Sequence, residues 1–247
     1  MDRRRALAAS EEEVRRLTGQ PISEATPSRR DFLLHVTTQK QELAIVARLG
    51  PREGPSGNGW GTAELLAHAR ACDDAEVAAL AVTTGVGGVS MQDLAAIAQA
   101  TTAPLLRDDL IIHPSQLYHA RLHGADAAVL PLADLEDSAI EALIDAAHSV
   151  HMAAILELLG EAQVERAVRR PRVILGLRCT DQNGALDLDH TCQLAQRLPR
   201  YRTSLTLAEI RSAAEYNALQ GVCDAVVLGE ALLAGDVGSV LQAITGR

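Results

Sequence analysis

The chain has 247 residues, of which 47% are hydrophobic, and a formal net charge of −9 at pH 7. This acidic balance argues against a nucleic-acid partner, because nucleic-acid surfaces of proteins are basic. No apolar run reaches the roughly 18 residues of a membrane span, and the first residues contain no apolar signal segment. We therefore expect no membrane contact, a cytoplasmic location and four reduced cysteines, which show no CxxC spacing.

Lysine is almost absent from the chain. Of 23 basic residues only Lys40 is a lysine, and the others are arginines. Arginine stays protonated and is not a nucleophile, so it cannot replace lysine in Schiff-base chemistry. Any mechanism that needs two lysines is therefore excluded.

The first 41 residues are predicted to form an N-terminal extension. A charged amphipathic helix is expected over about residues 4–18, followed by a Pro- and Ser-containing connector and the segment DFLLHV (31–36). We expect this extension to lie outside the main domain, which spans residues 42–247. The segment 49–61 is a long first loop rich in Gly and Pro, a length that is often functional.

From residue 42, short apolar runs alternate with segments of helical spacing. The eight runs are 42–48, 77–83, 103–107, 126–132, 153–158, 172–178, 200–205 and 224–229. Continuous apolar strands indicate a parallel sheet that is buried on both faces. Eight such units predict a (β/α)₈ TIM barrel with an N-terminal helical extension. An open doubly wound sheet is the alternative, but its Gly-rich first turn is absent. The seventh run is polar, and its boundary is the least defined.

Active sites in this fold lie at the carboxyl ends of the strands. The residues that end the predicted runs or follow them are Arg48, Thr83, Thr84, Arg107, Asp108, Asp109, Pro131, Glu157, Arg178, Ser204, Thr206, Gly229 and Glu230. Because strand residues alternate between the inside and the outside, Arg107 and Asp109 should face away from the barrel mouth if Asp108 faces it. We therefore expect Arg107 and Asp109 to make structural ion pairs.

Several segments together resemble the indole-3-glycerol-phosphate synthase family. They are PLLRDDLIIHPSQLYHARLHGADAAVL, AAILEL, DAVVLGEALL and the DFL that precedes the first strand. The resemblance covers essentially the whole chain. It implies a barrel whose reaction decarboxylates, closes and dehydrates an anthranilate-derived ribulose phosphate, with no metal and no cofactor. The family carries a Glu and a Lys on strand one, an acid Lys after strand three, a basic Glu on strand five, an Asn and an Arg on strand six, and Glu-Ser-Gly on strand seven.

This sequence departs from most of that pattern. The strand-one pair falls on Ile45 and Ala47, the acid Lys on Asp108, the strand-six pair on Arg178 and Thr180, and the strand-seven motif on about Leu205-Thr206-Leu207. Glu157 on strand five and Gly229-Glu230 on strand eight are retained. An unperturbed Asp is ionised at neutral pH and cannot donate a proton. We therefore expect no efficient synthase activity.

Two functional hypotheses remain open from the sequence. The first is a diverged carbon–carbon lyase in which Glu157 acts as base and Asp108 as a second acid/base group. It would act on a small anionic molecule, phosphorylated or not. Arg178 and Arg48 would hold the anion, His113 and Thr206 would contact the substrate, and Gly229 and Glu230 would bind phosphate. The second hypothesis is a non-catalytic barrel that binds a ligand or a partner enzyme, with the carboxylates paired to arginines.

Three further features each have two interpretations. His119 and His123 have a spacing that can bind metal, but no third ligand is evident, so we expect a surface pair and no metal site. The loop 83–88 is either a glycine-rich anion nest or a plain connector. Trp60 either stacks on a ligand or packs against the protein, and packing is favoured.

Overall fold

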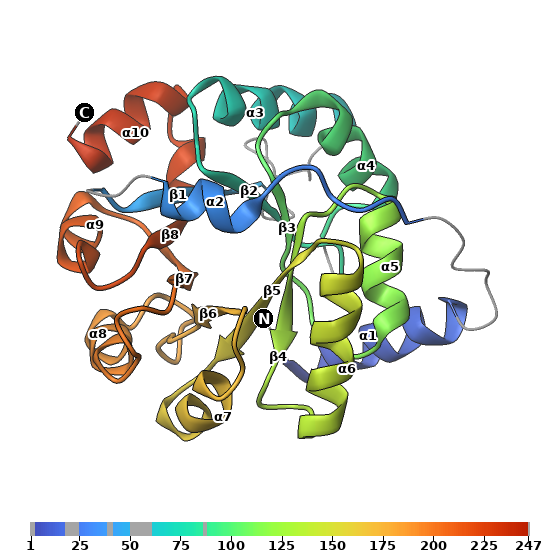
Figure 1. Ribbon diagram of the computed structural model, residues 1–247. Coiled ribbons are helices and arrows are strands. Elements are labelled where there is room, and N and C mark those ends of the chain that lie inside the picture. Colours follow the sequence, from blue (N-terminus) through green and yellow to red (C-terminus); the bar gives the residue numbers. More distant parts are fainter. Residues whose placement is uncertain (1–2, 18–24, 39–41, 50–60, 86–87, 247) are drawn as a thin grey trace.

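The computed structural model describes residues 3–17, 25–38, 42–49, 61–85 and 88–246. Eight parallel strands pair in chain order, and β1 pairs with β8, so the sheet closes into a barrel (Figure 1). The strands are β1 (Ala44–Leu49), β2 (Ala79–Val82), β3 (Leu105–Arg107), β4 (Ala127–Pro131), β5 (Ala153–Leu158), β6 (Ile174–Leu177), β7 (Ser204–Ile210) and β8 (Ala225–Leu228). The predicted (β/α)₈ fold is confirmed.

Helices surround the barrel, two of them before β1 and the others in the segments after the strands (Figure 1). They are α1 (Arg3–Leu17), α2 (Phe32–Thr37), α3 (Thr62–Asp74), α4 (Met91–Ala100), α5 (Pro114–Leu122), α6 (Asp137–Ser149), α7 (Val164–Val168), α8 (Leu188–Gln196), α9 (Ala213–Leu219) and α10 (Val237–Thr245). Two short 3₁₀ helices, η1 (Glu161–Gln163) and η2 (Glu230–Leu233), follow β5 and β8. None of the helices in these ranges combines the length and apolar character needed to cross a bilayer.

Two apolar layers hold the barrel together. One cluster fills its inside with aliphatic residues such as Val46, Leu106 and Ile155, and the other packs the outer strand faces against the helices. The strands are apolar on both faces because each face meets one of these layers. This explains why the sequence reads as continuous rather than alternating apolar runs.

Strand β7 lies later in the chain than the sequence predicts. It runs over Ser204–Ile210, whereas the polar segment 200–205 is predicted. Its pairing with β8 shifts between Leu205 and Glu209, so the strand contains an irregularity that lengthens it. Residues 200–203 precede the strand, which begins at Ser204. As a consequence, the carboxyl end of β7 carries Glu209 rather than Thr206.

The N-terminal extension is part of the packed structure. Helix α1 lies close to the predicted bounds and packs against α5, while α2 contributes Phe32 and Val36, each 1% exposed, to the inner apolar cluster. Asp31 caps α2 by accepting a hydrogen bond from the Leu34 N–H. Residues 31–36, expected outside the barrel, therefore close its amino-terminal end. Lys40 and Trp60 lie outside the described residues.

Candidate active site

Side-chain alternation selects the residues that face the barrel mouth. Val46, Leu106, Ile155 and Leu207 point into the inner apolar cluster. The residue two positions further along each strand points the same way, above this apolar layer. These residues are Arg48, Asp108, Glu157 and Glu209. Arg178 follows β6 and completes a ring of charged groups at the carboxyl ends.

Asp108 lies at the centre of this ring. It is 5% exposed, and its Oδ2 accepts a hydrogen bond from Arg48 at 2.5 Å. Its Oδ1 accepts a second bond from the Arg178 guanidinium. Both arginines also donate to the carbonyl oxygen of Leu207 on β7, at 3.1 and 3.2 Å. One carboxylate therefore joins strands β1, β3, β6 and β7 across the mouth.

Glu157 is held from two directions. Its Oε1 accepts from Nε of Arg178 at 2.5 Å, and its Oε2 accepts from Arg3 of α1 at 2.6 Å. Glu157 is 2% exposed, and Arg3 also pairs with Asp134, which follows β4. The N-terminal helix thus places a cation directly on the predicted catalytic base.

Glu209 is a site residue that the sequence reasoning missed. It accepts from Arg48 at 2.9 Å, and its Oε2 also accepts from the backbone N–H of Glu230 at 3.1 Å. The carboxyl end of β7 therefore does carry an acidic residue, which the expected match at Leu205-Thr206-Leu207 does not contain. The Ala-Glu pair at 208–209, followed by an apolar residue, was the available signal.

The chain's own carboxylates occupy both predicted anion-binding turns. In the loop after β2, Asp109 accepts from the backbone N–H groups of Thr84 and Gly85, at 3.1 and 2.8 Å. After β8, the Glu230 N–H is occupied by Glu209, and Gly229 precedes a 3₁₀ turn of only four residues rather than a long helix. A phosphate at either turn would have to displace a carboxylate.

The charges keep the central groups ionised. Burial alone would raise the pKa of Asp108, but the charges of Arg178 and Arg48 outweigh burial and lower it. Burial would lower the pKa of Arg178, and the carboxylates of Asp108 and Glu157 raise it instead. Asp108 is therefore an anion at neutral pH and has no proton to donate.

The remaining predicted contacts serve local structure. His113 caps α5, and its Nδ1 accepts from the Ser115 N–H at 3.2 Å. Thr206 is fully buried and points away from the mouth, because its neighbours Leu205 and Leu207 point inward. Its Oγ1 accepts from the Val227 N–H at 3.2 Å. The position predicted for Thr206 at the mouth is therefore wrong.

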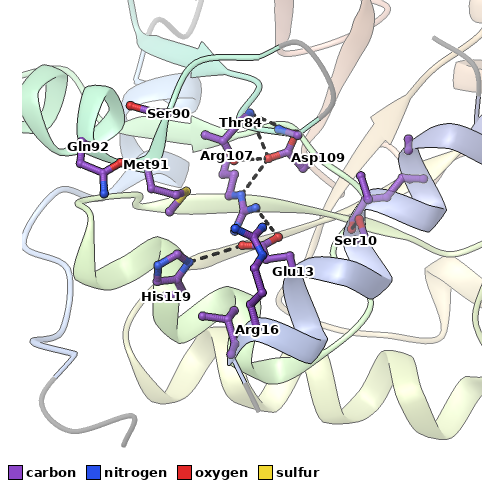
Figure 2. A pocket seen from close by; sticks show the side chains of 15 residues that line it. Ser10, Glu13, Arg16, Thr84, Ser90, Met91, Gln92, Arg107, Asp109 and His119 are labelled. Carbon is purple, nitrogen blue, oxygen red and sulfur yellow. Dashed lines mark hydrogen bonds and ion pairs between the residues drawn. The ribbon is translucent and has the colours of Figure 1, made fainter. Parts of the chain in front are cut away.

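Arg107 and Asp109 form the outward ion pair that the sequence predicts, at 2.8 Å. Arg107 is 2% exposed and also donates to Glu13 of α1 at 2.8 Å. Gln116 and His119 contact the same Glu13 carboxylate. This outer cluster joins β3 and α5 to the N-terminal helix (Figure 2).

A cavity of about 590 Å³ lies beside this outer cluster, between α1 and the start of α4 (Figure 2). Glu13, Arg16, Met91 and Arg107 are among its lining residues, whereas Arg48, Asp108, Glu157 and Arg178 are not. The cavity is thus separate from the ring of charges at the mouth.

Among the described residues, the fold brings no third metal ligand to the His119–His123 pair. The rings of His119 and His123 meet edge to face with centroids 4.6 Å apart, and His119 contacts Glu13. Within the described ranges, no group of three His, Cys, Asp or Glu side chains is arranged to hold a metal ion.

A closed barrel of eight parallel strands with charged groups at their carboxyl ends defines the TIM-barrel class. Within that class, the chain belongs to the indole-3-glycerol phosphate synthase family, whose model matches residues 1–244. An indole-3-glycerol phosphate synthase of Mycolicibacterium vanbaalenii is 32% identical over 196 residues, covering 77% of this chain and 71% of that protein. The synthase of Mycobacteroides abscessus is 30% identical over 250 residues, covering 97% and 89%.

Solved structures with lower identity share the fold. A 3-hexulose-6-phosphate synthase from Salmonella typhimurium has a TM-score of 0.67 at 17% identity, covering 83% of this chain and 97% of that one. Orotidine 5'-phosphate decarboxylase from Pyrococcus horikoshii has a TM-score of 0.61 at 13% identity, covering 81% and 97%. At these identities the likeness concerns the barrel alone.

Proposed function

We propose that this chain is a binding member of the family that does not catalyse the synthase reaction. The observation that carries the proposal is Asp108, which stands where the family has its acid lysine and bridges Arg48 and Arg178. A positioned general acid is worth about 10²–10⁴ in rate, and an ionised, doubly paired carboxylate cannot supply it. The occupied turns support the same proposal, because Asp109 already accepts from the backbone N–H groups of Thr84 and Gly85. Glu209 likewise accepts from the N–H of Glu230.

The test is turnover of the anthranilate-derived ribulose phosphate by the purified full-length chain. Formation of the indole product is followed by fluorescence, with a family synthase as positive control. We expect no turnover in the usual range of about 1–10³ s⁻¹. Asp108→Lys restores the family's residue type and serves as the matched variant. Ordinary turnover by the unmodified chain would overturn the proposal.

A second candidate is a diverged enzyme that performs metal-free acid/base chemistry on a small anionic indole-, anthranilate- or sugar-phosphate-like molecule. One observation favours it: Arg48 Nε is buried and has no hydrogen-bond partner among the described residues. Such a donor is free to bind an incoming carboxylate or phosphate oxygen. In this scheme Glu157 is the base, and Arg178 and Arg48 hold the anion.

A ligand panel distinguishes the two candidates. Thermal shifts are measured with indoles, anthranilates and sugar phosphates on the unmodified chain, on Glu157→Gln and on Arg178→Ala. The diverged-enzyme candidate requires an anion that stabilises the unmodified chain and loses its effect in Arg178→Ala. Shifts that both substitutions leave unchanged would remove these residues from the site.

A further inference from the structure

At the barrel mouth, carboxylates outnumber arginines when helix α1 is not counted. Among the described residues, the ring contains two strand-end arginines, Arg48 and Arg178. Four carboxylates face them or lie beside them: Asp108, Glu157, Glu209 and Asp134. The third cation in the cluster is Arg3, which comes from α1 rather than from the barrel.

Arg3 makes the kind of contact that a bound guanidinium would make. One terminal nitrogen lies 2.6 Å from Glu157 Oε2 and also bonds Asp134, while Nε lies 3.1 Å from each Asp134 oxygen. Glu157 is 2% exposed, whereas the Arg3 side chain remains 32% exposed at the rim. A planar guanidinium between two carboxylates is a favourable bidentate arrangement.

The same surroundings disfavour an anion. The carboxylates of Asp109 and Glu209 occupy the backbone donors of the two turns, and Asp108 engages both strand-end arginines. An incoming phosphate would have to compete with these carboxylates and remain near them in a site of low dielectric. Arg48 Nε is the one buried side-chain donor of the ring without a partner among the described residues. The edge of the mouth formed by Glu157 and Asp134, in contrast, offers carboxylate oxygens and suits a positive group.

We propose that the barrel mouth binds a small molecule with a guanidinium or primary amine group, which Glu157 and Asp134 hold, and that Arg3 competes with this group for the same two carboxylates. The inference rests on the proposed binding function and names its ligand class. Arg3 is then an internal competitor. Such a competitor reduces the apparent affinity for the ligand, because only the molecules in which Arg3 has left this position can bind it.

The test uses agmatine as the cationic probe and the full-length chain with Arg3→Ala. Binding is measured by titration calorimetry, with anthranilate and inorganic phosphate as anionic probes. We expect Arg3→Ala to bind agmatine at least about tenfold more tightly than the unmodified chain, because the competitor is gone. The double variant Arg3→Ala/Glu157→Gln should lose this gain. Arg15→Ala is the matched control, since Arg15 lies on the same helix and pairs only with exposed Glu12 among the described contacts.

A second measurement needs no substitution. Agmatine at saturating concentration should speed hydrogen exchange of the first turns of α1, because the ligand and Arg3 compete for Glu157. Agmatine binding that is equal in Arg3→Ala and Arg15→Ala would overturn the inference. So would tighter binding of phosphate or anthranilate than of agmatine. Neither result depends on synthase turnover, so failure here differs from failure of the proposed function.

Discussion

The two faces of strand β3 carry opposite arrangements of charge. On the inward face, the anion Asp108 lies between two cations, Arg48 and Arg178. On the outward face, the neighbouring cation Arg107 lies between two anions, Asp109 and Glu13. Both central groups are buried, at 5% and 2% exposure. The inner cluster joins strands to one another and reaches α1 only through Glu157 and Arg3. The outer cluster joins the barrel to α1 directly through Glu13.

One short charged stretch, residues 107–109, contributes side chains to both the inner and the outer cluster. Residues 107–109 are consecutive, yet alternation along the strand sends their side chains to different environments. Each charge is compensated by partners from distant parts of the chain, such as Glu13 and Arg178. Buried charges need such partners, because an unpaired buried ion is strongly destabilising.

The largest expected effect on stability comes from breaking the inner cluster. Asp108→Ala should lower the free energy of unfolding by roughly 3–5 kcal/mol, since it removes the buried carboxylate that pairs with both partly buried arginines, Arg48 and Arg178. Urea denaturation measures the change. Glu165→Ala, which removes an exposed pair with Arg169, is the control and should cost no more than about 0.5 kcal/mol. Equal effects of the two substitutions would show that the inner cluster contributes no stability.

Breaking the outer cluster should lower the free energy of unfolding less, and it should act mainly on α1. Arg107→Met should cost about 2–3 kcal/mol, because the two carboxylates that it leaves behind keep other donors. Glu13 still contacts Gln116 and His119. Asp109 still accepts from the backbone N–H groups of Thr84 and Gly85. It should also speed hydrogen exchange in α1 more than Asp108→Ala does, since Asp108 pairs with Arg48 and Arg178, which lie on the barrel and not on that helix. Exchange in α1 that rises equally in both variants would contradict the separation of the two clusters.

Acid should weaken the outer cluster through Glu13. Burial alone would raise the pKa of Glu13, but the His119 contact and the Arg107 charge outweigh it and lower the pKa from 4.5 to about 2. A depressed carboxyl pKa contributes stability that is fully present above pH about 4.5 and is lost as the pH falls toward 2. We expect Glu13→Gln to remove this loss of stability at acid pH. The loss should be at most about 2 kcal/mol, because Glu13 is partly exposed and water screens its charge. Denaturant titrations from pH 5 to pH 2 measure it. A profile unchanged by the substitution would show that Glu13 does not titrate with folding.

Much of the fold could be predicted because its signals are local. The eight apolar runs and their helical spacers specify a parallel sheet covered on both faces, and seven of the runs coincide closely with strands. Strand β7 was misplaced because its last residues include Glu209, whose charge hid a strand end in the sequence. Likewise, α2 carries exposed Leu33 and Leu34 beside buried Phe32 and Val36, so its place in the core was not apparent.

The sequence predicted four members of the charged ring, Arg48, Asp108, Glu157 and Arg178, but not Glu209 and not the way these residues pair. Alternation along the strands brings Asp108, Glu157 and Arg48 to one mouth, and a regular barrel makes that arrangement unavoidable. The pairing of each carboxylate depends on distances between strands that are far apart in sequence. The placement of Arg3 on Glu157 depends on how α1 packs across the barrel, which no local pattern encodes.

The sequence by itself determined the barrel, its family and most of the charged residues at the strand ends, Glu209 excepted, because these follow from hydrophobic periodicity and short motifs. Only the tertiary structure decided that the carboxylates are paired with arginines, that Asp109 and Glu209 fill the two anion turns, and that Arg3 covers Glu157. The physical reason is that ion pairing acts through space. Its outcome depends on the distance and burial of groups more than 20 residues apart in the chain, and both are properties of the folded molecule.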